Sequence, residues 1–220
     1  MKRVIHLGMI VLAFLLIAGC GSKTVKGNGN VVTESRTVSS FDAVKATGNL
    51  NLMIKADASP ALSVVADDNL QQYIITKVNR NELIISVKEG YALTGTHPIV
   101  INIATSDLRD LSMAGSIRAN VTGLDNPTFD LNSSGSSAIQ LAGSTNKVTM
   151  DLLGDSEVDA KNLTAKEAGL DVSGTSKVNV YASKKLVVKI SGSGEVTYYG
   201  SPPIINQAVF GSGKINKGTN

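Results

Sequence analysis

The stretch Leu152-Leu-Gly-Asp-Ser-Glu-Val-Asp-Ala160 is matched, one repeat further on, by Val172-Ser-Gly-Thr-Ser-Lys-Val-Asn-Val180. In both segments one apolar residue stands two positions before the glycine. Two further apolar residues stand four and six positions after it. The same glycine recurs at Gly115, Gly135, Gly154, Gly174, Gly192 and Gly211, and successive positions differ by 20, 19, 20, 18 and 19. Self-similarity at a nearly fixed period indicates a repeat fold, so the chain between consecutive glycines is called a coil.

Side chains alternate in character around each glycine. The positions expected to face inward are Ala119, Ile139, Val158, Val178, Val196 and Ile215, then Val121, Leu141, Ala160, Val180 and Tyr198, and, before the glycine, Met113, Ser133, Leu152, Val172, Ile190 and Val209. The positions expected to face outward are Asn120, Gln140, Asp159, Asn179, Thr197 and Asn216. This period of two is typical of β-strands, whose successive side chains point to opposite faces.

A coil of about 19 residues is too short for a strand plus a full helix and too long for a hairpin. It fits two or three short strands separated by bends, with successive coils stacked as parallel strands. The sequence therefore predicts an all-β fold, a parallel β-solenoid that resembles a right-handed β-helix. An antiparallel sandwich is the alternative, but a sandwich gives no reason for the same inward and outward phase to recur six times.

Charges support this stacking. The position three after the glycine is occupied by Arg118, Ala138, Glu157, Lys177, Glu195 and Lys214. The last four alternate in sign, so we expect opposite charges to become neighbours when the coils stack.

Before the repeat, short apolar segments between residues 31 and 105 predict N-terminal β coils, continuous with the regular repeats of residues 106–220 as one domain. The segment Asn79-Arg-Asn81 predicts a turn. Residues 67–74 predict the one helical turn, with aspartate at its start accepting hydrogen bonds from free backbone N–H groups.

The N-terminus reads as a sorting signal. Lys2 and Arg3 precede an apolar run over residues 4–18, too short to span a bilayer comfortably. The run ends in Leu16-Ile-Ala-Gly-Cys20, which resembles a bacterial lipobox. This predicts a lipoprotein signal peptide over residues 1–19, a lipid on Cys20 and a flexible tether over residues 20–30. The alternative is cleavage near Ala18, which leaves Cys20 as a free thiol.

The expected location follows from these residues. A lipid on Cys20 anchors the protein to a membrane without spanning it, and Gly21 in place of Asp favours the outer membrane if the source is Gram-negative. Without residues 1–19 the chain keeps 19 Lys and Arg, since 21 minus Lys2 and Arg3 is 19, against 18 Asp and Glu. That balance gives no indication of a nucleic-acid partner.

Composition excludes several kinds of site. Cys20 is the only cysteine, and His6 and His97 are the only histidines, which excludes disulfide frameworks, Cys and His zinc sites, and Cys–His nucleophilic chemistry. No cofactor or metal is predicted. The serine-rich residues 133–137 lack a companion base, so they are interpreted as small corner residues.

Several segments carry a family resemblance: Asn28-Gly-Asn30, Arg36-Thr-Val-Ser-Ser-Phe41-Asp-Ala-Val44, the glycine series, Tyr198-Tyr-Gly-Ser-Pro202 and Gly211-Ser-Gly-Lys-Ile215. Together they resemble the head GIN domain family of putative auto-transporter adhesins. The resemblance implies a β-solenoid envelope protein, found largely as bacterial lipoproteins, with no established catalytic activity.

Carboxylates leave one enzymatic alternative open. Parallel solenoids include polysaccharide lyases and glycosidases, and stacked carboxylates can bind calcium or act as an acid/base pair. The candidates are Asp151, Asp155, Glu157, Asp159 and Asp171. They alternate with Lys and Asn and no aromatic platform surrounds them, so they are interpreted as a solvated face. The sequence predicts a non-catalytic envelope protein that binds a protein or glycan, with a carbohydrate-active enzyme as the alternative and no oligomeric state assigned.

Overall fold

The computed structural model describes residues 22–219. The predicted signal peptide and Cys20 lie outside these residues. The chain is all-β, as predicted: 74% of the described residues lie in strands and 3% in helix, and the large mixed sheet does not close. Among residues 22–219, no helix is long and apolar enough to cross a membrane.

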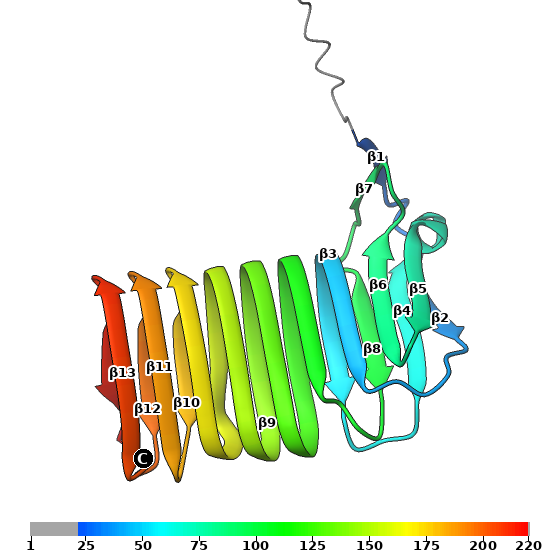
Figure 1. The fold of residues 1–220 in the computed structure, drawn as a ribbon. Helices are drawn as coiled ribbons and strands as arrows, with labels where there is room; N and C mark the ends of the chain where they lie inside the picture. Colours follow the sequence, from blue (N-terminus) through cyan, green and yellow to red (C-terminus); the bar gives the residue numbers. More distant parts are fainter. Residues whose placement is uncertain (1–21, 220) are drawn as a thin grey trace, which may run out of the picture.

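Fourteen strands and one short helix are described, and Figure 1 shows most of them stacked along one axis. In chain order they are β1 (Lys23–Lys26), β2 (Val31–Arg36), β3 (Ala43–Lys55), β4 (Ala61–Asp67), η1 (Asp68–Tyr73), β5 (Ile74–Asn79), β6 (Glu82–Val87), β7 (Tyr91–Thr94), β8 (Val100–Ala104), β9 (Asp110–Gly174), β10 (Lys177–Tyr181), β11 (Lys185–Gly192), β12 (Glu195–Tyr199), β13 (Ile204–Gly211) and β14 (Lys214–Lys217).

The C-terminal half consists of parallel strand pairs in constant register. Strand β10 pairs with β9 and β12, β12 pairs with β14, and β11 pairs with β9 and β13, all in parallel. Lys177 lies between Glu157 and Glu195, and Glu195 lies next to Lys214. The predicted neighbour relations of these four charges are therefore confirmed.

The repeated glycines stand above one another at one corner of the stack. Gly154 has a φ of +109°, and a Cβ added there would lie 2.5 Å from the carbonyl oxygen of Gly135. Any other residue would meet both an unfavourable backbone conformation and the backbone of the previous coil. Gly48 in β3, which the sequence did not reveal, pairs with Gly115 and has a φ of +127°. The glycine ladder therefore comprises Gly48, Gly115, Gly135, Gly154, Gly174, Gly192 and Gly211.

Burial confirms most of the predicted inward positions. Val158, Val172 and Ile190 have no exposed side-chain surface, and the core runs without interruption from β3 to β12. Ser133 is the polar member of the inward row, and its hydroxyl donates to Ser137 Oγ at 3.0 Å inside the stack. Tyr198 and Ile215 are only partly buried. For Val209 the prediction is wrong: it is 40% exposed, because its strand β13 is the last of its layer and has no further coil over it.

The N-terminal third differs from the predicted coils. Strand β4 pairs antiparallel with both β2 and β8, and β5 pairs antiparallel with β6. The β5–β6 connection is the predicted turn, with Arg80 and Asn81 at φ values of 49° and 67°. Two consecutive left-handed residues form the tight hairpin turn that matches the twist of antiparallel strands, which explains why the chain reverses here instead of continuing as coils.

The predicted helical turn is present as η1, but the role expected for its first aspartate is wrong. The side chain of Asp67 makes no capping hydrogen bond. Its carboxylate instead accepts from the backbone N–H of Gly29 at 2.6 Å, and from the N–H and Oγ1 of Thr96 at 2.9 and 2.7 Å. Asp67 is 1% exposed and thereby joins two segments that lie far apart in the sequence.

Residues 23–30, predicted to be part of a flexible tether, are instead attached to the body. Strand β1 pairs in parallel with β7. Asn28 and Asn30 donate to the carboxylate of Asp68 at 2.6 and 2.7 Å. Gly27 lies so close to the Asp67 carboxylate that an added Cβ would collide with it. The Asn28-Gly-Asn30 motif is thus a docking segment and not a linker.

Acid is expected to release this docking segment. Hydrogen bonds from Thr96 lower the pKa of Asp67, and hydrogen bonds from Asn30 and Asn28 lower the pKa of Asp68. Because the folded-state pKa values lie below the unfolded values, their stabilisation is complete above the usual aspartate range and is lost as the pH falls through the lowered values. Hydrogen exchange of the backbone amides in residues 23–30 measures this release.

Asp67→Asn should speed exchange over residues 23–30 already at neutral pH, because it removes the charge that three donors face. Asp57→Asn, at an exposed aspartate, is the matched control and should exchange as the wild type does. Equal exchange rates in the two variants would contradict the docking role of Asp67.

Candidate functional site

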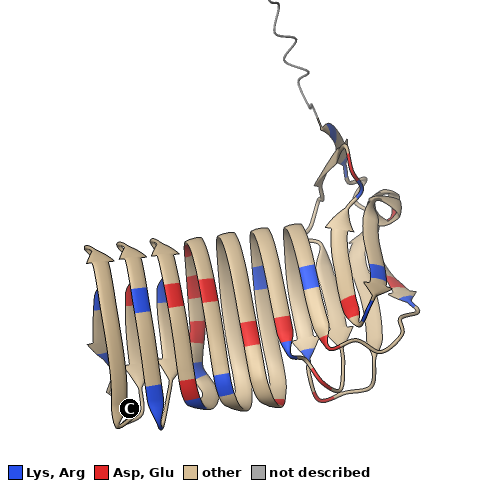
Figure 2. Cartoon of the chain, viewed as in Figure 1, with Lys and Arg blue, Asp and Glu red and all other residues tan. Residues whose placement is uncertain are grey.

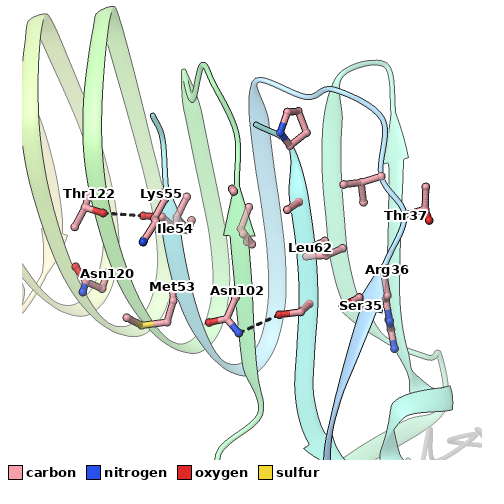
Figure 3. A pocket seen from close by; sticks show the side chains of 16 residues that line it. Ser35, Arg36, Thr37, Met53, Ile54, Lys55, Leu62, Asn102, Asn120 and Thr122 are labelled. Carbon is pink, nitrogen blue, oxygen red and sulfur yellow. Dashed lines mark hydrogen bonds between the residues drawn. The ribbon is translucent and has the colours of Figure 1, made fainter. Parts of the chain in front are cut away.

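An open groove of about 790 Å³ lies on the outer surface of the sheet, over strands β2, β4, β8, β3 and β9. Figure 3 shows the side chains that line it. Strand registers place one row of them directly across the sheet: Asn120, Met53, Asn102, Ser63 and Ser35. A second row runs through Thr122, Lys55, Ala104 and Ala61.

Differences in side-chain size create the groove. Its floor consists of short side chains, among them Ser63, Ala61 and Ala104, on the paired strands β4 and β8. Met53 and Lys55 form one wall, and the segment of residues 36–38 forms the other. Met53 is 44% exposed, so its side chain presents apolar surface to the groove.

Half of the residues that line the groove carry polar or charged side chains, and some of these already have partners within the protein. Asn102 Nδ2 donates to Ser63 Oγ at 3.1 Å. The guanidinium of Arg36 donates to the carbonyl oxygens of Ile74 and Gln71 at 2.6 and 3.0 Å and lies 3.0 Å from the Glu34 carboxylate. Lys55 is exposed, so it is the lining cation most accessible to a ligand.

The residues that line the groove include no aspartate, glutamate, histidine or cysteine. The groove therefore offers neither a general acid/base pair nor a set of metal ligands. What it offers is exposed apolar surface around Met53, bordered by hydroxyl and amide groups and one accessible cation, an arrangement that suits binding of a ligand with an apolar body and an acidic group.

The five predicted carboxylates lie on the outer surface away from this groove. Asp171 Oδ2 lies 2.8 Å from Lys189 Nζ, and Asp159 Oδ2 lies 3.5 Å from Lys161 Nζ. Glu157 pairs in register with Lys177. Acidic and basic residues are intermixed along the strands of this part of the stack, as the red and blue segments in Figure 2 show. Asp151 and Asp155 are exposed. Among the described residues, no group of three or more His, Cys, Asp or Glu could hold a metal ion.

A different carboxylate on this surface, which the sequence pattern did not single out, has a raised pKa. Burial raises the pKa of Asp110, while the hydroxyl of Ser112 donates to it at 2.9 Å and the nearby charges of Asp130 and Glu82 add to the increase. Glu82 lies near Asp110 because both pair with Ala43 of strand β3, one on each side. Strands β7 and β8 lie between Glu82 and Asp110 in the chain, so no local spacing could have revealed this cluster.

Comparisons with known proteins agree with this architecture. A family model described as "Putative auto-transporter adhesin, head GIN domain" matches residues 40–202. No curated protein matches the chain.

Several solved structures share the fold. A putative adhesin from Bacteroides fragilis aligns with a TM-score of 0.69 at 20% identity, covering 88% of this chain and 99% of its own. A putative lipid binding protein from Parabacteroides distasonis aligns with a TM-score of 0.51 at 26% identity, covering 90% and 100%. A putative adhesin from Parabacteroides merdae aligns with a TM-score of 0.51 at 19% identity, covering 90% and 100%.

Proposed function

Because this chain belongs to the head GIN domain family of putative auto-transporter adhesins, we propose that it is a non-catalytic, lipid-anchored protein of the cell envelope. In this proposal a β-solenoid of about 19 residues per coil presents its outer faces to an envelope protein or glycan. The anchor is a lipid on Cys20, and the membrane is the outer membrane if the source is Gram-negative.

The observation that carries this proposal is the regular outer face. Polar side chains such as Gln140, Asn179 and Thr197 recur at the same position of successive coils, over a core that is continuous from β3 to β12. A rigid surface with a repeating polar pattern suits attachment to an extended partner. The family and the solved structures that share the fold are described as putative adhesins or as a putative lipid binding protein.

Cys20→Ser is expected to move the protein from the membrane fraction to the soluble fraction. The substitution removes the thiol that receives the lipid. Residues 22–219 are unchanged, so we expect them to fold as in the wild type. Fractionation of cells, with mass measurement of the mature N-terminus, tests this. A wild-type protein that is soluble, or that carries a free thiol at Cys20, would refute the lipid anchor.

The groove supports lipid binding as a second candidate function. Its exposed Met53, its floor of short side chains and the accessible cation of Lys55 suit an acyl chain with an acidic headgroup. The Parabacteroides distasonis protein, 26% identical and aligned over its full length, is described as a putative lipid binding protein. The ligand class that we propose is therefore a fatty acid or a lipid of similar shape.

Ala104→Phe is expected to weaken binding of a fluorescent fatty acid by about tenfold or more, because the new ring occupies the floor of the groove. Lys55→Gln should weaken binding of the acid but not of the matching fatty alcohol. Ala138→Phe, on an exposed alanine of β9 that does not line the groove, is the control. Fluorescence titration that gives equal affinity for all three variants would exclude this site.

The enzymatic alternative has less support. The predicted carboxylates lie outside the groove, and two of them pair with lysines. Cleavage of a polysaccharide that disappears in Asp151→Asn or Asp171→Asn would favour the enzyme over the adhesin.

A further inference from the structure

Strand β13 leaves one edge of the sheet open at the C-terminal end of the stack. Within residues 22–219 it pairs with β11 alone. Its sequence, Ile-Ile-Asn-Gln-Ala-Val-Phe-Gly, contains no charged residue. Four of its side chains are large, apolar and exposed: Ile204 at 51%, Ile205 at 36%, Val209 at 40% and Phe210 at 65%. An open, uncharged and apolar edge strand is a template for pairing with another chain.

Two other edge strands, one at each end of the strand order of the large sheet, are better protected. Strand β14, the second edge at the same end, is short and carries Lys214 and Lys217. Strand β2, at the opposite end of the large sheet, carries Glu34 and Arg36. Short length and charge are the usual means by which proteins prevent edge-to-edge association. The absence of both in β13 distinguishes this edge from the other two.

The sequence of β13 is also symmetric about its centre. Ile204 and Ile205 precede Asn206 and Gln207, and Val209 and Phe210 follow at matching distances. The register with β11 aligns Ile205, Gln207 and Val209 with the buried Leu186, Val188 and Ile190, so these three face inward. Ile204, Asn206, Ala208 and Phe210 consequently face outward.

We propose that β13 pairs antiparallel with β13 of a second copy of this chain, about a two-fold axis at Gln207. In this register Ile204 lies opposite Phe210 of the second copy on the outer face, and Ile205 lies opposite Val209 on the inner face. Directly opposed residues of antiparallel strands point to the same side, so each inward residue meets an inward residue. A contact that matches itself in this way is what two-fold symmetry requires.

The dimer continues an interface that already exists inside the molecule. Each coil covers the apolar row of the previous one, and β13 covers Ile190 in the same way that the second copy would cover Val209. A single strand pair buries less than the roughly 1,200–2,000 Å² of a standard interface, so we expect a weak dimer that dissociates on dilution. Lys214 and Lys217 of the two copies approach each other at the neighbouring β14 edges, so added salt should strengthen the dimer.

Sedimentation equilibrium of the full chain in a mild detergent tests the proposal. The wild type should show a concentration-dependent dimer, and Phe210→Lys should weaken it by about tenfold or more, because each dimer loses two apolar pairs. Leu153→Lys removes another exposed apolar side chain, 58% exposed on β9, and should leave the dimer unchanged. Detergent makes the result independent of the lipid anchor. A monomer at all concentrations, or equal effects of the two variants, would overturn the proposal.

A crosslink tests the register itself. Gln207→Cys places one new thiol beside its symmetry mate, so mild oxidation should yield a covalent dimer. Gln140→Cys, on an exposed position of β9, is the control, and Cys20 is common to both variants.

As a complementary test, a chain with Ile204→Lys and Phe210→Lys should pair with a chain carrying Ile204→Glu and Phe210→Glu, while neither pairs with itself. Equal crosslinking at residues 207 and 140, or no pairing in the mixture, would exclude this register.

Discussion

Val178→Lys is expected to prevent folding or to lower the melting temperature by many degrees. Val178 is 2% exposed and lies between Val158 and Val196 of the neighbouring strands, neither of which has any exposed surface. A lysine there would place an unpaired ammonium group in an interior without water. The cost is several kcal/mol, a large share of a total stability typically near about 5–15 kcal/mol. Thermal melts followed by circular dichroism measure it.

Asn179→Lys is the matched control for this prediction. Asn179 is the next residue, faces outward, and lies between Asp159 and Thr197 in register. A lysine at this position remains in water beside a carboxylate, so we expect a change of no more than about 0.5 kcal/mol. Equal losses at the two positions, or the larger loss at Asn179, would contradict the alternation of inward and outward side chains.

Gly154→Ala is the second substitution with a large expected effect. At a φ of +109° the alanine is strained, and its Cβ would lie 2.5 Å from the carbonyl oxygen of Gly135 in the previous coil. The two effects together should cost roughly 3 kcal/mol or more, since a strained backbone alone costs about 1–3 kcal/mol. Denaturant unfolding of the purified variant measures the loss.

Substitutions at two other glycines distinguish the cost of backbone strain from the cost of the steric clash. Gly48 has a similar φ of +127°, but a Cβ there would meet only Val87 Cγ2 at 3.7 Å, so Gly48→Ala should show the strain alone. At Gly169 an added Cβ meets nothing within 4 Å, and Gly169→Ala should be neutral or stabilise by up to about 1 kcal/mol. If Gly154→Ala were no worse than Gly48→Ala, close coil contact would not explain the glycine ladder.

The C-terminal half was predictable because its information is local and repeated. One glycine and the residues around it specify the inward phase, and six copies make the pattern visible. The register of Glu157, Lys177, Glu195 and Lys214 follows from the same spacing and is confirmed. Val209 breaks the pattern because burial also depends on a following coil, which a local pattern cannot describe.

The N-terminal third and the groove were not predictable in the same way. Gly48 belongs to the ladder, yet it stands far from Gly115 in the sequence, since strands β4 to β8 lie between them. The groove depends on the sizes of side chains from five strands, such as Met53 and Ala104, that only the sheet register brings together. A search for alternating apolar residues does not take the sizes of side chains into account, so it could not predict the groove.

The glycine ladder has a consequence for the dimensions of the molecule. In the solenoid that we propose, each coil contacts only the coils before and after it, and neighbouring strands are roughly 4.8 Å apart. Inserting or deleting one coil between Gly154 and Gly174 would change the length of the stack by that step and leave both ends chemically intact. The stack can therefore serve as a molecular ruler, in which the number of coils sets how far the C-terminal edge lies from the N-terminal end (Figure 1).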